Sequence, residues 1–83
     1  MELMKNPVFA VREEKNLSVT DLAMMAGVGA LRIRQIEKGE PYTLNGKVLD
    51  ALVELGYSRT SLISSYGDWR KKLASLKKAG IKS

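Results

Sequence analysis

Cysteine and histidine are both absent from this chain of 83 residues. Without cysteine it forms no disulfide and offers no thiolate to a metal ion, and without histidine it lacks the most frequent general base and a frequent zinc ligand. No apolar run approaches the roughly 18 residues that span a bilayer. We therefore expect neither an enzyme nor a cofactor-dependent protein, and no association with a membrane.

The composition that remains is typical of one small globular domain. Apolar residues make up 45% of the chain and charged residues 28%. A chain of this length buries only about 60% of its unfolded surface, so it has room for a single small core. The segment 1–7 contains an early acid and a proline and lacks the apolar centre of a signal peptide, so we expect a cytoplasmic protein.

The excess of positive charge is confined to the C-terminal end. Residues 1–67 contain eight basic and eight acidic side chains, so the formal net charge of +5 comes entirely from residues 68–83. A basic segment of this kind commonly contacts phosphate, and the alternative is a solvated helix face that only keeps the protein in solution. Its basic residues are Arg70, Lys71, Lys72, Lys77, Lys78 and Lys82.

The capping residues predict where the first three helices begin and end. Asn6 and Pro7 favour the start of a helix that ends near Asn16, and Ser18 is a preferred N-cap for a second helix through Ala26. Gly27 ends that helix, because glycine adopts a left-handed backbone conformation without steric cost. A third helix of about residues 30–38 ends at Gly39 in the same way.

The second half of the chain is also predicted to be helical. We expect Thr43 to cap a fourth helix of about residues 44–55 and Ser58 to cap a last helical region. Gly67 and Asp68 could divide this last region into two helices, with Asp68 as the second N-cap. No segment alternates as a half-buried strand does, so we predict an all-α fold.

The most informative segment is residues 17–39. Two helices of about eight residues each lie on either side of a three-residue turn. Ala23 is small enough for the third helix to cross over it, and Val28, Ile33 and Ile36 fill the wedge between the two helices. The outer face of the third helix is then free to enter the major groove of DNA.

These positions carry a resemblance to a known family. Leu17-Ser18, Leu22-Ala23, Ala26-Gly27-Val28, Ile33 and Ile36-Glu37-Lys38-Gly39 stand where members have the same or similar residues. Over roughly residues 8–64 the chain resembles the Cro and lambda-repressor-like helix-turn-helix family, the XRE-type transcriptional regulators. The resemblance implies a five-helix domain, here with an extended or broken C-terminal helix. We expect the helix-turn-helix domain over residues 1–66 and a basic C-terminal helix of the same unit over 67–83. The resemblance also implies a structural ion pair between Arg12 and Glu37.

The function implied by the resemblance is that of a sequence-preferring regulator, repressor-like, with the third helix reading double-stranded DNA. This sequence departs from the family at the start of that helix, because Gly29, Ala30 and Leu31 have no side chain that forms hydrogen bonds with bases. Val19 also replaces a phosphate-binding glutamine. Either the apolar residues pack on thymine methyl groups, or the helix presents an apolar patch to a protein partner, as in an antirepressor.

The residues expected to contact DNA come from the second and third helices and the loop after them. Ser18 and Thr43 are helix caps in either interpretation. The Tyr42 hydroxyl is a candidate hydrogen-bond donor to a DNA phosphate, and the alternative role of Tyr42 is core packing. The expected DNA contacts are Ser18, Val19, Gly29, Ala30, Leu31, Arg32, Arg34, Gln35, Lys38, Tyr42 and Thr43.

The last helical region carries an apolar stripe at 4-3-4-3 spacing. This stripe either packs back on its own domain or forms a two-fold interface, and family members usually bind DNA as dimers on two half-sites. We therefore expect a homodimer. The residues of the stripe are Leu62, Tyr66, Trp69, Leu73 and Leu76.

Overall fold

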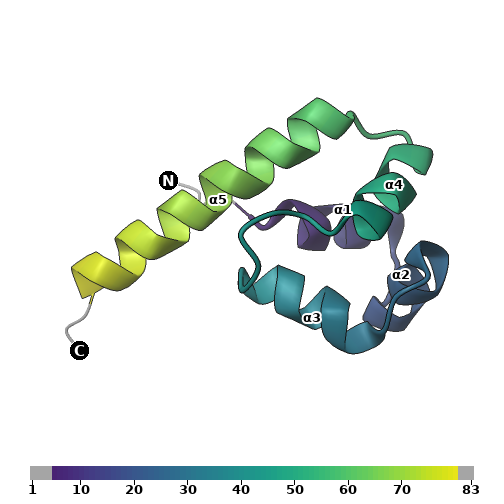
Figure 1. Cartoon of the computed structure of the whole chain (residues 1–83), viewed down its shortest axis with the longest axis horizontal. Coiled ribbons are helices and arrows are strands. Elements are labelled where there is room, and N and C mark those ends of the chain that lie inside the picture. The colour runs from purple at the N-terminus through teal and green to yellow at the C-terminus, as the bar shows by residue number, and fades with distance from the viewer. Residues whose placement is uncertain (1–4, 81–83) are drawn as a thin grey trace.

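The computed structural model describes residues 5–80 of the chain and the side chains of residues 5–76. Over that range the chain forms five α-helices and no strand, which confirms the all-α expectation. In Figure 1, α3 lies along the lower edge, whereas α5 runs along the upper edge and projects past the other helices. The helices are α1 (Pro7–Lys15), α2 (Val19–Ala26), α3 (Ala30–Lys38), α4 (Gly46–Glu54) and α5 (Arg59–Gly80).

Side-chain caps set the starts of the first two helices as predicted. The Asn6 side-chain oxygen accepts hydrogen bonds from the amides of Val8 and Phe9 at 2.8 and 3.1 Å. Ser18 Oγ accepts from the Asp21 amide at 2.9 Å, and the Asp21 carboxylate accepts from the Ser18 amide at 3.0 Å. This reciprocal capping box lowers the pKa of Asp21, because the hydrogen bond from the Ser18 amide stabilises the charged form.

The start of α4 differs from the prediction. Thr43 does not cap this helix, which begins two residues later than expected. The Asn45 side chain is the N-cap instead, and it accepts hydrogen bonds from the amides of Lys47 and Val48 at 2.8 and 3.3 Å. Asparagine is the stronger N-cap of the two, and placing the start at Gly46 lets Leu44 pack against the core.

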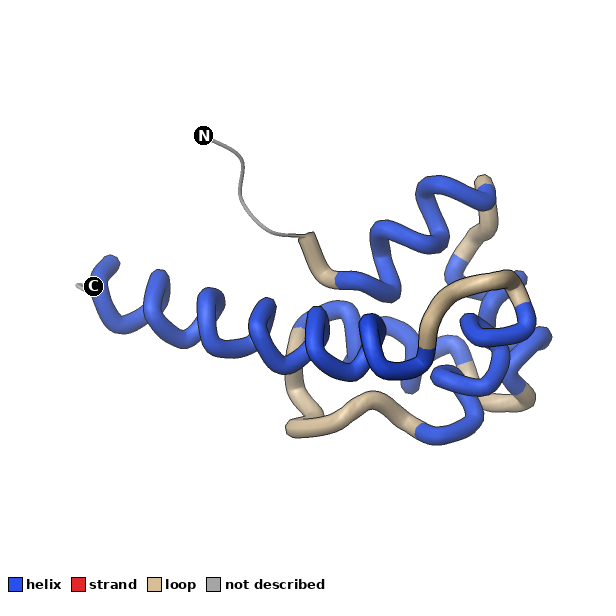
Figure 2. Tube along the Cα trace, turned by 90° about the horizontal axis from the view of Figure 1, so that it is seen from above, coloured by secondary structure: helices blue, strands red, loops and turns tan. Residues whose placement is uncertain are grey.

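The C-terminal helix is unbroken. Gly67 and Asp68 lie within α5, and Figure 2 shows the helix as one uninterrupted element. A glycine inside a helix costs only about 1 kcal/mol, which the packing of apolar side chains on both sides of Gly67 offsets. The sequence allowed either one extended helix or two helices divided at Gly67 and Asp68, and the structure has the extended helix.

The core lies between the inner faces of all five helices. Ile33 and Ile36 of α3 are fully buried, and Tyr66 of α5 is the largest fully buried side chain. Leu49 of α4 lies in the core, while Leu55 is the C-cap of this helix and only partly buried. No helix in the described part of the chain has the length and apolar character to cross a membrane.

Candidate nucleic-acid interface

The outer face of α3 is exposed and carries mostly basic side chains. Arg32, Arg34 and Lys38 are exposed, Gln35 is partly exposed, and Leu31 is 66% exposed. Because Ile33 and Ile36 turn toward the core, the 3.6-residue period of the helix turns these other side chains outward. The backbone of α3 is thus positioned by its apolar side, which leaves the polar side for a ligand.

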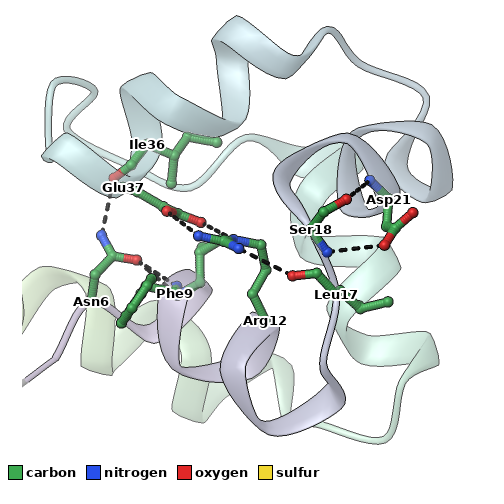
Figure 3. Close-up of polar contacts among 9 residues, drawn as sticks. Asn6, Phe9, Arg12, Leu17, Ser18, Asp21, Ile36 and Glu37 are labelled. Atoms are coloured by element: carbon green, nitrogen blue, oxygen red, sulfur yellow. Dashed lines mark hydrogen bonds and ion pairs between the residues drawn. The ribbon is translucent and has the colours of Figure 1, made fainter.

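The C-terminal end of α3 is tied to α1 by side-chain hydrogen bonds (Figure 3). Asn6 Nδ2 donates to the carbonyl of Ile36 at 3.0 Å. Arg12 donates from Nε and Nη2 to the two carboxylate oxygens of Glu37, at 2.7 and 3.0 Å. The structure therefore contains the ion pair that the family resemblance implied, in a bidentate arrangement.

The pair between Arg12 and Glu37 is largely, but not completely, shielded from water. Their side chains are 17% and 15% exposed, and Arg12 Nη1 also donates to the carbonyl of Leu17 at 3.1 Å. The hydrogen bonds to Glu37 raise the pKa of Arg12 above its ordinary value, and partial burial opposes that shift. One guanidinium thus joins α1, the loop before α2 and the last turn of α3.

The segment that follows α3 is held from the other side by α5. Gly39 has a φ of +83°, and a Cβ added there would lie 2.7 Å from Trp69 Cζ3. Arg70 Nε donates to the carbonyl of Gly39 at 2.9 Å, and the Tyr66 hydroxyl donates to the carbonyl of Pro41 at 2.8 Å. Burial raises the pKa of the Tyr66 hydroxyl, and the nearby Arg70 lowers it to a smaller extent. The segment that leaves α3 is therefore held both by packing against α5 and by hydrogen bonds from it.

A depression of about 740 Å³ lies beside the first turns of α3. Its walls come from α3 (Leu31, Arg32, Gln35), from the turn of residues 27–29 and from the first turn of α4 (residues 45–47). The start of α4 therefore lies next to the exposed face of α3. Lys47 is exposed at this position, and the sequence analysis did not single it out.

The basic side chains around this face have no acidic partner. Within residues 5–76, no hydrogen bond or ion pair joins Arg32, Arg34, Lys38 or Lys47 to another side chain. Some charges elsewhere in the described residues are paired, as between Arg59 Nη2 and the Asp50 carboxylate at 2.6 Å. Unpaired cations on one exposed face produce a positive potential that attracts a polyanion.

The remaining predicted contacts are distributed unevenly around α3. Val19 and Ala30 pack partly against the core, so their side chains contribute little to the exposed face. Gly29 is the N-cap of α3 and, because it has no side chain, it cannot cap the helix with a side-chain hydrogen bond. Tyr42 is 84% exposed, which argues against core packing for it, and Thr43 is exposed beside it.

The apolar stripe of α5 packs largely on its own chain. Leu62 is 5% exposed and Tyr66 1% exposed, so the expectation that these two residues lie in a dimer interface is corrected. Trp69 packs against the core and over Gly39, while Leu76 is 47% exposed. A contact between two copies of the chain across a two-fold axis stays a prediction for the C-terminal end of the stripe. The side chains of Lys77 and Lys78, and Lys82 altogether, lie outside the described residues.

The arrangement of α2 and α3 defines the class of protein. Gly27 has a φ of +74° and turns the chain sharply between the two helices, and the second helix presents an exposed, unpaired basic face. An all-α domain built in this way is a helix-turn-helix protein.

Comparison with known proteins agrees with this assignment. The helix-turn-helix family model matches residues 8–62, and the chain belongs to this family. An uncharacterised HTH-type transcriptional regulator of Sinorhizobium fredii (strain NBRC 101917 / NGR234) is 48% identical over 48 residues. That alignment covers 58% of this chain, which in turn spans 63% of the length of the relative. No solved structure matches the chain.

Proposed function

We propose that this protein is a transcriptional regulator that binds double-stranded DNA by inserting α3 into the major groove. The observation that carries the proposal is the exposed face of α3, on which Arg32, Arg34 and Lys38 have no partner in the described part of the chain. Membership of the helix-turn-helix family supports it, as does the name of the relative from Sinorhizobium fredii.

Base reading would come from the middle of α3. An arginine at position 34 suits the O6 and N7 acceptors of guanine, and Gln35 suits the N6 and N7 atoms of adenine. Leu31 is exposed one turn earlier, where it would contact a thymine methyl group. Arg32 and Lys47 flank the same depression and would contact phosphates, which position the protein without reading sequence.

The proposed mode of action is repressor-like, because it requires only that the protein occupies its DNA site. A protein that fills one turn of the major groove excludes other proteins from the same bases. Two half-sites one helical turn apart would suit a dimer, which raises affinity beyond that of a single recognition helix.

A second function is favoured by one observation. Met24, Met25 and Leu31 are 76%, 47% and 66% exposed, which places large apolar side chains on α2 and at the start of α3. Adaptable methionine side chains are common on protein-binding surfaces. In this alternative the domain binds another protein, as an antirepressor would.

Selection from random duplexes, followed by titration at several salt concentrations, separates the two functions. A DNA-binding protein selects a preferred site and loses affinity steeply as salt rises. Comparing one copy with two copies of the selected half-site then tests the dimer. Weak binding even at low salt, with no selected sequence, would favour the protein-binding alternative.

The contribution of α3 is tested by changing Arg34 and Gln35 together to alanine. At about 1–3 kcal/mol for each good base contact, we expect a loss of at least roughly 2 kcal/mol in binding to the selected site, with an unchanged circular dichroism spectrum. Arg59→Ala is the matched control, because Arg59 is paired with Asp50 and lies outside the proposed interface. Equal affinities of the double variant and the control would contradict the proposed role of α3.

A further inference from the structure

Arg70 is a residue of α5, outside the part of the chain that matches the family. It packs on the loop that follows α3, with its guanidinium carbon 4.7 Å from the centre of the Tyr42 ring. We propose that Arg70 and Tyr42 together bind one backbone phosphate of DNA. The proposal rests on the proposed function and adds a contact that comes from the C-terminal helix.

The guanidinium is held in one orientation but keeps most of its donors free. Arg70 Nε donates to the carbonyl of Gly39 at 2.9 Å, and the central carbon of the guanidinium lies over the aromatic ring of Tyr42. Arginine has five N–H donors in a rigid fork. In the described part of the chain, the two terminal nitrogens of Arg70 have no hydrogen-bond partner.

The Tyr42 side chain supplies a second donor at the same place. It is 84% exposed, and its hydroxyl makes no hydrogen bond within the described residues. The contact with Arg70 restricts the ring and keeps the hydroxyl near the guanidinium, whose carbon lies 4.7 Å from the ring centre. Two preorganised donors around a positive charge suit a phosphate diester, which arginine binds through parallel hydrogen bonds.

The location of the pair agrees with a DNA backbone. Gly39 directly follows the last residue of α3, so the pair lies where the chain leaves the recognition helix. Figure 1 shows the loop after α3 rising toward the middle of α5 at the left of the molecule. Backbone phosphates border the major groove, and a helix inserted in the groove has them near its ends. Glu40 is the neighbouring acid, and it forms no ion pair with Arg70.

Holding the loop does not account for the free donors of Arg70. Tyr66 already fixes Pro41 by a hydrogen bond, and Trp69 covers Gly39. A single donor is enough for the carbonyl of Gly39. The stacked fork and its unneutralised charge are therefore available to a ligand.

The salt dependence of DNA binding distinguishes a phosphate contact from a structural one. Arg70→Gln removes the charge, and we expect the slope of log K against log salt to fall by about 0.9, which is the value for one phosphate contact. Over a four-fold rise in salt this makes the loss of affinity about 3.5-fold smaller than in the unchanged protein. The shift is expected on the selected duplex and on a duplex of mixed sequence alike, because phosphate contacts carry no base information.

Four further variants complete the test. Arg59→Gln removes the same charge from the same helix at a residue paired with Asp50, and its slope should match that of the unchanged protein. Arg70→Lys keeps the charge and should keep the slope while binding more weakly. Tyr42→Phe should bind both duplexes more weakly, whereas Tyr57→Phe should not, because Tyr57 donates to Glu14 outside the proposed interface.

The outcomes are separable. If the unchanged protein binds DNA but Arg70→Gln keeps the full slope, the phosphate site is wrong and the proposed function stands. If the unchanged protein does not bind DNA at low salt, the proposed function fails first. Should Arg70→Gln fail to fold, as judged by its thermal transition, equal affinities of Tyr42→Phe and Tyr57→Phe would overturn the site on their own.

Discussion

The helices α1 and α5 both hold the end of α3, but they do so by different physical means. From α1, Asn6 and Arg12 reach the last turn with hydrogen bonds and an ion pair. From α5, Trp69 packs on Gly39 and supplies mostly apolar contact. The first attachment holds Ile36 and Glu37 in the last turn of α3, and the second holds Gly39, where the chain leaves the helix.

The two attachments also differ in how they relate to the family match. The pair between Arg12 and Glu37 lies within residues 8–62, which match the helix-turn-helix family, whereas Asn6, Trp69 and Arg70 lie outside that range. The apolar attachment therefore comes from the part of α5 that follows the match.

The largest expected effect comes from removing the apolar attachment. Trp69→Ala should lower the free energy of unfolding by about 3 kcal/mol, at the lower end of the range for buried aromatic residues, because Trp69 is partly exposed. Chemical denaturation measures this. Leu76→Ala, at a side chain that is 47% exposed, is the control and should change stability by less than about 0.5 kcal/mol.

The contact with Gly39 can be isolated by a double-mutant cycle. Gly39→Ala is strained both by its left-handed backbone and by the approach of Trp69, and only the second cost disappears when Trp69 is also changed. A change in sedimentation with Trp69→Ala, without loss of stability, would instead place this side chain in a dimer.

Breaking the polar attachment should have an intermediate effect. Arg12→Ala leaves the carboxylate of Glu37 largely buried and unpaired, and we expect a loss of about 2 kcal/mol in stability, below the 3–5 kcal/mol of fully buried pairs because water reaches the site. Arg12→Lys keeps the charge but not the bidentate fork and should lose less. Lys5→Ala, in a pair whose side chains are 60% and 52% exposed, should be nearly neutral. Equal losses for Arg12→Ala and Lys5→Ala would contradict the importance assigned to the buried pair.

The smallest effect is expected at the capping box, which contributes to neither attachment. Ser18→Ala should cost about 1 kcal/mol. Because the folded state lowers the pKa of Asp21, the stabilisation from its carboxylate is present above the ordinary carboxyl pKa of about 3.9 and is lost as the pH falls through the lower folded value. Ser18→Ala keeps the backbone amide that donates to this carboxylate, so Asp21→Asn is the variant that tests the pH dependence. Thermal melting between neutral and acid pH should show that Asp21→Asn and the unchanged protein converge in acid. A constant difference between these two would argue against the role of the carboxylate in the capping box.

The sequence predicted the elements whose signals are local. Asn6, Ser18 and Gly27 act within a few residues of their position, and the first three helices begin and end where these residues indicate. The ion pair between Arg12 and Glu37 was available only through the family resemblance, since its partners are 25 residues apart.

What the sequence left undecided depends on contacts between distant segments. The prediction of Thr43 as the cap of the fourth helix was wrong: Asn45 is an acceptable cap as well, and the packing of Leu44 against the core favours the later start. The role of Trp69 could not be read from the 4-3-4-3 stripe, because the spacing is the same whether its partner is a second chain or Gly39. Arg70 carried no signal beyond its charge.

Asn6 has a consequence for the dynamics of the molecule. Its side chain is 6% exposed and serves two helices at once, since it accepts from the first-turn amides of α1 and donates to the Ile36 carbonyl in α3. Fraying of the first turn of α1 therefore also breaks the hydrogen bond to the Ile36 carbonyl, while Arg12 still holds Glu37 in the same turn of α3. An opening that exposes the amides of Val8 and Phe9 to hydrogen exchange thus loosens one of the contacts at the end of α3, so the N-terminal edge of the domain and the end of α3 are coupled.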